Sequence, residues 1–258
     1  MCATVKTVED ILNELAPMET AESYDNVGTI VGRRDAKVTK ILVALDCTWD
    51  VVKEAEKLGA ELIVSHHPLT FHARKNLLEE DAEGRILCEM VRNNLSLIAA
   101  HTNLDQAPGG VNDTLASCCG LTDVSGEAFF RCGLLREPLS AAEYAEKLRT
   151  LLHTEVRLMG PEDRLIRKVG LCSGGGSDEW HRALESGCDA FISGEIKHHF
   201  GLAMADSGII GLECGHFATE EPGIRALAYA LQKRINQVEC NVRIYVSEIS
   251  AYSFPRQP

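Results

Sequence analysis

Four short segments of this sequence concentrate side chains that could bind metal ions. They read SHHPLTF from Ser65, HTNLD from His101, SGEIKHH from Ser193 and GHFATE from Gly215, and seven of the nine histidines lie in or beside them. Imidazole and carboxylate groups are the ligands that Zn, Mn, Fe, Co and Ni take from proteins. Several histidines together with Asp and Glu exceed the needs of one tetrahedral ion. The segments therefore predict a site for two divalent metal ions per subunit.

The spacing of the ligands supports two ions. Adjacent residues at the end of a strand point to opposite faces, so His66 and His67 would not easily chelate one ion but could reach two ions on either side of a bridging carboxylate. Asp105 is the candidate for that bridge. His216 and Glu220 lie four residues apart, so a helix beginning near residues 219–222 could turn the Glu back towards the His.

For several residues near these candidate ligands the sequence allows more than one role. His101 could be a ligand, a partner that orients a ligand, a general acid or base, or a structural residue. Glu195 and His199 could line the active cavity, whereas His198 and His72 are expected to be ordinary surface residues. The turn Gly174-Gly175-Gly176 could cradle a phosphate or could simply be a tight turn.

The elements that must position these segments follow the pattern of an α/β fold, in which short apolar runs alternate with amphipathic stretches. Strands are expected at 41–45, 61–65 and 95–100. A helix is expected at 49–58, ending at Gly59, and another at 141–152 with Ser140 as its N-cap. The candidate ligands then follow the carboxyl ends of strands, where open α/β sheets bind ligands.

The chain also resembles itself after a shift of 128 residues. Lys168-Val169-Gly170-Leu171 aligns with Lys40-Ile41-Leu42-Val43, and Phe191-Ile192-Ser193 aligns with Ile63-Val64-Ser65, with no gap over about 28 positions. We therefore predict two related α/β domains with mixed sheets flanked by helices and a dinuclear metal site between them. The first half would take in residues 1–125 and the second residues 126–258.

Composition limits the classes of function. The 258 residues carry 26 Lys and Arg against 38 Asp and Glu, a formal charge of −12, so neither nucleic acid nor an anionic membrane gains a general electrostatic hold. No apolar run approaches the roughly 20 residues that span a bilayer. Ten cysteines without a Cys-x-x-Cys pair are typical of reduced, buried thiols. We expect a cytoplasmic protein.

The motifs resemble one known family. SHHPLTF, AHTNLDQAPGGVND, ISGEIKHH and GHFATE occur here in the order found in the NIF-three-like family, whose members are often labelled GTP cyclohydrolase type 2 homologs. The opening AESYDNVGTIVG is also similar to a segment of that family, and the match runs from about residue 8 to 225. The resemblance implies a toroidal homohexamer with a dinuclear site in each subunit. It implies the metal ligands His66, His67, Asp105, His216 and Glu220.

Three positions depart from the family's pattern. Tyr24 stands where the family usually has Trp, Thr29 where an apolar residue is usual, and Glu195 where Asp is expected more often. None is one of the five ligands, but Glu195 could alter the cavity around the site.

Metal-assisted hydrolysis is the chemistry that these residues favour. Two ions sharing Asp105 would lower the pKa of a bridging water, and His101 is the candidate catalytic residue that moves the proton. The family label implies opening of the guanine ring of GTP, and a nucleotide or other phosphoester is an equally consistent small-molecule substrate. The alternative is a non-enzymatic protein that handles metal or presents a regulatory surface to a partner.

Overall fold

The computed structural model describes residues 3–238 and 240–250. Within these residues the chain forms two compact units, one made of the described residues of 3–108 and 224–250 and the other of Gly109–Gly223. This grouping follows packing contacts, whereas the predicted halves, 1–125 and 126–258, follow the internal repeat. The boundary at residue 125 stays a prediction. Residues 1, 2, 239 and 251–258 of the two predicted halves lie outside the described residues.

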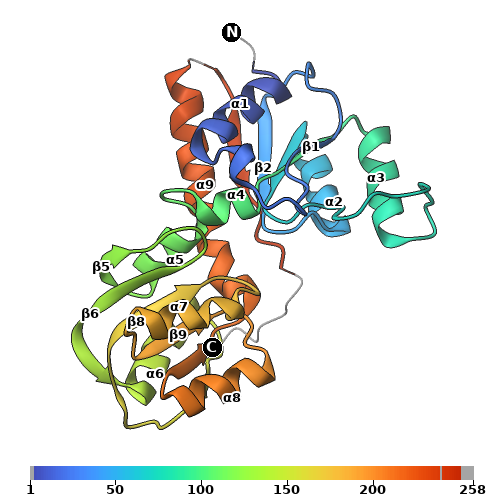
Figure 1. Cartoon of the computed structure of the whole chain (residues 1–258). Coiled ribbons are helices and arrows are strands. Elements are labelled where there is room, and N and C mark those ends of the chain that lie inside the picture. The colour runs from blue at the N-terminus through green and yellow to red at the C-terminus, as the bar shows by residue number, and fades with distance from the viewer. Residues whose placement is uncertain (1–2, 239, 251–258) are drawn as a thin grey trace. The chain divides into compact units, whose positions relative to one another are not determined.

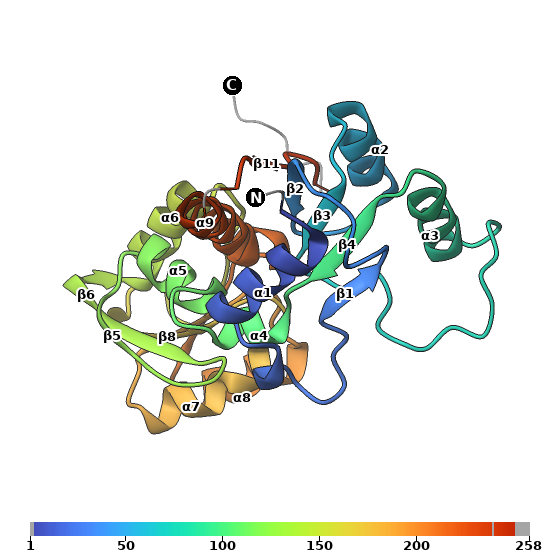
Figure 2. The same cartoon turned by 90° about the horizontal axis from the view of Figure 1, so that it is seen from above.

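The first unit, in which Figure 1 labels strands β1 and β2, is built around a five-stranded mixed sheet. The order of its strands is β1-β4-β3-β2-β11 (Figure 2). Strands β11, β2, β3 and β4 run parallel to one another, and β1 is antiparallel to β4. The strands are β1 (Gly28–Val31), β2 (Lys40–Ala44), β3 (Leu62–Ser65), β4 (Ser96–Ala99) and β11 (Arg243–Val246). The helices are α1 (Val5–Leu15), η1 (Met18–Thr20), α2 (Trp49–Leu58), α3 (Ala82–Arg92), α4 (Thr102–Gln106) and the part of α9 (His216–Gln237) from Ile224 onward.

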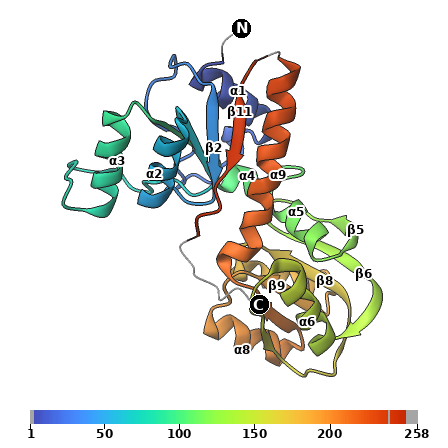
Figure 3. The same ribbon diagram turned by 180° about the vertical axis from the view of Figure 1, so that it is seen from behind.

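Helices cover both faces of this sheet. Helices α2 and α3 bury Val51, Val52 and Met90 against Leu42 and Ile63 on one face, while α1 lies on the other (Figure 2). Strand β11 lies beside α9 (Figure 3), where the side chain of Gln232 accepts a hydrogen bond from the Ile244 backbone N–H and donates one to the Val242 carbonyl. Burial of apolar side chains on both faces accounts for the continuous apolar runs of β2 and β3.

Local signals fix the ends of α2 as the sequence predicts. The Thr48 side chain accepts a hydrogen bond from the Val51 backbone N–H, and Gly59 ends the helix with a positive φ of 65°. That left-handed conformation is the one in which glycine lacks the steric cost of a Cβ. The predicted helix at 49–58 is therefore confirmed.

The second unit contains a six-stranded mixed sheet in the order β5-β6-β8-β9-β10-β7. Strands β8, β9 and β10 are parallel, and the remaining strands pair antiparallel. The strands are β5 (Thr122–Ser125), β6 (Arg131–Ser140), β7 (Arg157–Met159), β8 (Leu165–Cys172), β9 (Ala190–Ser193) and β10 (Ile210–Glu213). The helices are α5 (Val111–Cys118), α6 (Ala141–Leu152), η2 (Ser177–Glu179), α7 (Trp180–Glu185), α8 (His198–Ser207) and the start of α9.

Two apolar clusters enclose the second sheet. One packs Leu115 of α5 and Tyr144 of α6 against sheet residues such as Leu171, and the other packs Trp180 of α7 and Met204 of α8 against the opposite face. Helix α6 begins with the predicted N-cap: the Ser140 side chain accepts from the Glu143 N–H, and the Glu143 carboxylate accepts from the Ser140 N–H. The predicted helix at 141–152 is confirmed.

The two sheets share a register at an offset of 128 residues. Ile41 is aligned with Leu62 in β2 and β3, and Val169 is aligned with Ala190 in β8 and β9. Each sheet also carries an antiparallel edge strand beside its last parallel strand, β1 beside β4 and β7 beside β10. The predicted fold class, two related α/β domains with mixed sheets flanked by helices, is confirmed.

The repeat extends to side-chain hydrogen bonds. The Lys40 ammonium donates to the Leu58 carbonyl at 2.6 Å, and Lys168 donates to the Ser186 carbonyl at 2.7 Å. Glu61 accepts from the backbone N–H groups of residues 39 and 40, as Asp189 does from those of residues 167 and 168. In both βαβ units these hydrogen bonds link the first strand to the end of the helix and to the residue just before the second strand.

The cysteines mostly fill these cores. Seven of the nine cysteines in the described residues are buried, whereas Cys2 lies outside them. Burial raises the pKa of Cys47, Cys188 and Cys214 to about 12, so these thiols stay protonated near neutral pH. Among the described helices, none combines the length and apolarity needed to cross a membrane.

Candidate metal centre

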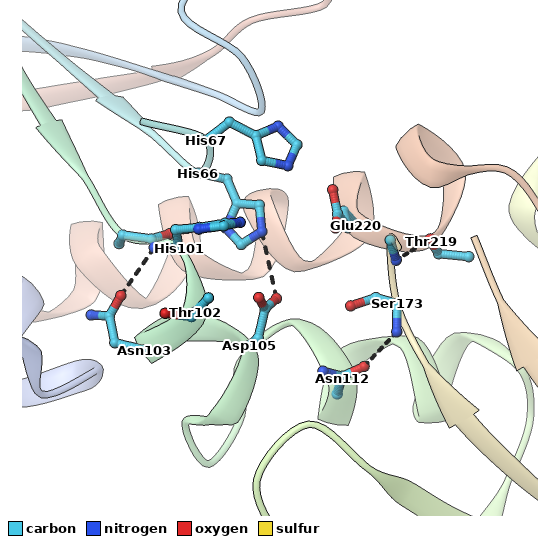
Figure 4. A network of polar contacts seen from close by, with 12 residues as sticks. His66, His67, His101, Thr102, Asn103, Asp105, Asn112, Ser173, Thr219 and Glu220 are labelled. Atoms are coloured by element: carbon cyan, nitrogen blue, oxygen red, sulfur yellow. Dashed lines mark hydrogen bonds and ion pairs between the residues drawn. The ribbon is translucent and has the colours of Figure 1, made fainter. Parts of the chain in front are cut away.

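Three histidines gather where β3 and β4 of the first unit end (Figure 4). His66 and His67 directly follow β3, and His101 precedes α4 by one residue. Each offers a ring nitrogen, and these nitrogens lie within 4.8 Å of one another. The ring centroids are 5.0 Å apart for His66 and His67, 5.0 Å for His66 and His101, and 5.4 Å for His67 and His101. This group could hold a metal ion.

The closeness of His66 and His67 differs from the expectation that they would point to opposite faces. Strand β3 ends at Ser65, so the alternation of side chains along a strand does not extend to either histidine. Their backbone N–H groups both donate to the Leu45 carbonyl, at 3.2 and 3.0 Å. The chain turns there, and both imidazoles come to the same side.

Asp105 joins this group from α4. Its Oδ1 lies 3.5 Å from His66 Nε2, and the His66 side chain is fully buried. The backbone N–H of Asp105 donates to the His101 carbonyl, so the turn of α4 places the carboxylate beside the histidines. The first unit thus brings His66, His67, His101 and Asp105 together, four of the residues singled out from the sequence.

Each histidine of this group is held by an oxygen at Nδ1. His66 Nδ1 lies 2.8 Å from the Ala100 carbonyl, which can only accept a hydrogen bond. His67 Nδ1 lies 2.8 Å from Asp46, and His101 Nδ1 lies 3.0 Å from Asp25. Nδ1 therefore carries the proton, and in the neutral ring the lone pair is on Nε2. Orienting a ligating histidine through its second nitrogen is a recurrent feature of metal sites.

Asp25 is the most strongly held of these carboxylates. Besides His101, it accepts from the Thr102 backbone N–H at 3.0 Å and from the Thr102 hydroxyl at 2.5 Å, and its side chain has no exposed surface. Burial alone would raise the pKa of Asp25, but the hydrogen bonds from His101 and Thr102 outweigh it and hold the pKa well below its usual range. Asp25 is therefore a carboxylate anion at neutral pH.

The second unit places His216 and Glu220 together. Both lie on α9, and His216 Nε2 is 3.1 Å from Glu220 Oε2. Their side chains are 28% and 5% exposed, so the carboxylate is buried while the imidazole keeps an accessible edge. The expectation that the helix begins near residue 219 is wrong, because α9 begins at His216 and contains Pro222. The two residues consequently lie one turn apart on the same helical face.

Glu195 holds His216 from behind. Its Oε1 lies 2.9 Å from His216 Nδ1, the same arrangement that Asp46 and Asp25 make with their histidines. Glu195 thus orients the imidazole of His216, a candidate metal ligand. His199 packs its ring against Phe200 with centroids 4.2 Å apart and is exposed, as is His198.

The glycine turn after β8 lies against the same pair. A Cβ on Gly174 would be 2.0 Å from Glu220 Oε1 and 3.1 Å from His216 Nε2, and its φ is +54°. A Cβ on Gly176 would be 2.0 Å from Cys172 Sγ. Close packing therefore accounts for these two glycines, in agreement with the tight-turn interpretation. The backbone N–H of Gly174 donates to Thr219 Oγ1 at 3.0 Å (Figure 4).

No sequence pattern predicts that Asp25 and Asp46 orient histidines of the site. Asp46 follows β2, the parallel neighbour of the strand that leads to His67, so the rule that strand ends gather polar residues could have found it. Asp25 lies 76 residues before His101 in an irregular segment between η1 and β1. The one sequence feature that points to Asp25 is its place in the AESYDNVGTIVG motif.

Comparisons with known proteins identify the family. The sequence model of the Duf34/NIF3 family (NGG1p interacting factor 3) matches residues 3–252. This chain belongs to the DUF34/NIF3 family. A Clostridium perfringens protein named GTP cyclohydrolase 1 type 2 homolog is 33% identical over 237 residues, which cover 88% of this chain and 90% of that protein.

Solved structures of relatives share the fold of this DUF34/NIF3 protein. A hypothetical protein of Staphylococcus aureus is 26% identical, with a TM-score of 0.92 over 99% of this chain and 100% of that one. A Bacillus cereus protein related to NIF3 has a TM-score of 0.94 at 20% identity, with 99% of both chains covered, which shows the fold alone. The resemblance inferred from the motifs is confirmed.

Proposed function

We propose that this protein is a metal-dependent hydrolase with two divalent ions per subunit, acting on a nucleotide or other phosphoester. The observation that carries the proposal is that four histidines are oriented in the same way, each by an oxygen at Nδ1. In His66, His67, His101 and His216, Nδ1 is held by an oxygen at 2.8 to 3.0 Å. That makes Nε2 the nitrogen that would bind a cation in His66, His67 and His216, and a proton in His101.

The groups facing two of these nitrogens fit a bound cation. Nε2 of His66 faces the Asp105 carboxylate at 3.5 Å, and Nε2 of His216 faces the Glu220 carboxylate at 3.1 Å. A neutral imidazole with its proton on Nδ1 would present a lone pair to an anion, which is unfavourable. Either the ring takes a second proton or a cation sits with both groups, and buried carboxylates favour the compensating positive charge.

The ligand count favours a shared dinuclear centre. His216 and Glu220 supply two ligands, fewer than the three or four protein ligands that zinc sites commonly have. We therefore propose that this pair combines with His66, His67 and Asp105 in one site between the two domains. Asp105 would bridge the ions, as the sequence analysis predicted. The mixture of imidazole and carboxylate suits Zn, Fe, Mn, Co or Ni and does not distinguish among them.

When bound, the two ions would supply positive charge for the transition state and a water of lowered pKa. The protein's own contribution is the orientation of its groups. His101, held by Asp25 at Nδ1, can accept a proton at Nε2 and pass it to a leaving oxygen. Asp25 stabilises the imidazolium that this transfer creates, because it is a buried anion in direct contact with the ring.

Two substrate classes fit this chemistry. The Clostridium perfringens relative is named GTP cyclohydrolase 1 type 2 homolog, which favours opening of the guanine imidazole ring of GTP. Cleavage of a phosphoester uses the same metal set. A toroidal homohexamer and a cytoplasmic location remain predictions from the family resemblance and the composition.

The test is turnover by protein loaded separately with Zn, Mn, Fe, Co or Ni and offered a panel of nucleotides and phosphodiesters. Asp105→Ala should lose bound metal and lower kcat/KM at least about 100-fold, the upper end of the range typical of an outer partner. Asp206→Ala, which removes an exposed carboxylate on α8, is the matched control and should change neither.

Two results would overturn parts of the proposal. Turnover that Asp105→Ala leaves unchanged would refute the metal mechanism. Full metal binding without turnover of any substrate in the panel would refute the hydrolase and leave the metal-handling alternative.

A further inference from the structure

An open pocket in the first unit adjoins the histidine group. It has a volume of about 450 Å³, within the range of sites that bind small molecules, and it is lined in part by residues 70–74. These residues belong to the long connection between β3 and α3 that Figure 2 shows. Asp25 lines it while holding His101, and Phe71 lines it while its ring meets that of His101 edge-on at 5.4 Å. A molecule in the pocket would therefore lie next to the proposed proton-transfer residue.

The walls of the pocket suit a planar heteroaromatic group. Phe71 is 40% exposed although it is a large apolar side chain, and Ile30 and Leu87 add apolar surface. Asn26 donates its side-chain N–H groups to the Thr70 carbonyl and hydroxyl, which fixes the amide and leaves its oxygen as the acceptor it can offer. An aromatic ring with nearby amide acceptors is the combination that binds nucleobases by stacking and hydrogen bonding.

The charges around the pocket disfavour a phosphate there. Arg74 is the lining residue with a permanent positive charge, and its guanidinium is engaged by Asp81 and Glu83, both at 2.5 Å. The buried carboxylate of Asp25 adds a further anion behind the wall. The two carboxylates on this guanidinium offset its attraction for a phosphate, whereas the cations proposed for the histidine group would attract a phosphate.

We propose that this pocket is a base-binding subsite, in which the base of a nucleotide stacks on Phe71 while its phosphate lies at the metal centre. The inference rests on the proposed function and deepens it, because this orientation favours phosphoester cleavage over opening of the base. A water oxygen bonds to phosphorus and gives up a proton to His101 Nε2, the ester P–O bond breaks, and His101 passes that proton to the leaving oxygen. Water is the co-reactant, and the products are a nucleoside alcohol and a phosphate.

Binding of base-containing and base-free phosphates to metal-loaded protein tests the subsite. The probes are GMP, AMP and ribose 5-phosphate, measured by titration calorimetry. Wild-type protein should bind GMP or AMP about 10-fold more tightly than ribose 5-phosphate, the lower part of the range for base stacking on an aromatic ring. Phe71→Ala should abolish this preference without changing the affinity for ribose 5-phosphate, and Phe71→Tyr should restore it.

Leu78→Ala is the matched control, because Leu78 belongs to the same connection, is 48% exposed and is not among the pocket's lining residues. It should behave as wild type. Metal content and circular dichroism of Phe71→Ala should match wild type. Equal affinity of wild type for the three probes, or a base preference that survives in Phe71→Ala, would overturn the subsite.

The two proposals can fail separately. Base-dependent binding through Phe71 without turnover of any nucleotide or phosphoester would refute the hydrolase and leave the subsite supported. Turnover of phosphoesters with no difference between wild type and Phe71→Ala would sink the subsite alone.

Discussion

Replacing Asp25 by Asn should damage both the fold and the proton-transfer residue His101. The Asp25 carboxylate accepts four hydrogen bonds, from His101 Nδ1, from the N–H and hydroxyl of Thr102, and from the Asn26 N–H at 2.8 Å. An amide keeps one acceptor oxygen and turns an NH2 group towards the remaining donors. A hydrogen bond to a buried charged group is worth roughly 1.5–3 kcal/mol, so losing at least one and opposing two donors should cost about 2–4 kcal/mol.

Asp46→Asn provides the comparison. Asp46 makes one contact of the same kind, 2.8 Å from His67 Nδ1, but its side chain is 36% exposed, so water can replace what the substitution removes. Its effect on the free energy of unfolding should stay below about 1 kcal/mol. Asp46→Asn should weaken metal binding about 10- to 100-fold, because it removes the group that orients the candidate ligand His67. Asp25→Asn should lower turnover by a similar factor, because it removes the group that orients the proton-transferring His101.

The assay is thermal unfolding of chelator-treated protein together with metal titration of each variant. At about 2–4 °C per kcal/mol for a protein of this size, Asp25→Asn should lower Tm by roughly 5–10 °C and Asp46→Asn by less than about 3 °C. Equal shifts in Tm for the two variants, or a metal affinity of Asp46→Asn unchanged from wild type, would refute this expectation.

Three further predictions follow from contacts elsewhere in the two units. Burial by itself would raise the pKa of Glu61, but hydrogen bonds from two backbone N–H groups lower it, so its stabilisation is fully present above about pH 4.5 and is lost as the pH falls below that value. Glu61→Gln should cost about 1 kcal/mol in urea unfolding at pH 7, with the difference shrinking as the pH falls below about 4.5; a difference that stays constant would contradict this. Gly174→Ala should displace Glu220 and reduce bound metal, whereas Gly175→Ala, whose Cβ meets nothing within 4 Å, should not. Removing metal with a chelator should lower Tm, and readdition should restore it; a Tm insensitive to metal would mean that the buried carboxylates need no cation.

The repeating part of the fold was predictable because its signals are local. The run at 41–45 became β2, and Gly59 ended α2 where the sequence said it would. Ser140 and Glu143 form a capping box that the sequence places directly before an amphipathic stretch. The antiparallel edge strands β1 and β7 and the last strand β11 carry no such signal, because they are short and pair with strands far away in the chain.

The site divides in the same way. Histidines at strand ends can be read from the sequence, and the structure places His66, His67 and Asp105 together in one unit and His216 with Glu220 in the other. The groups that orient them could not be read from spacing. Asp25 reaches His101 only because the segment before β1 folds back over α4, and no periodicity reports such a long-range contact.

The metal content of the native protein tests the central claim most directly. Protein purified without chelator and saturated with each candidate metal should be subjected to elemental analysis against a protein concentration from amino-acid analysis. The account predicts two divalent ions per chain in the wild type and fewer than two in Asp105→Ala. A saturating content below two ions per wild-type chain would contradict the dinuclear centre.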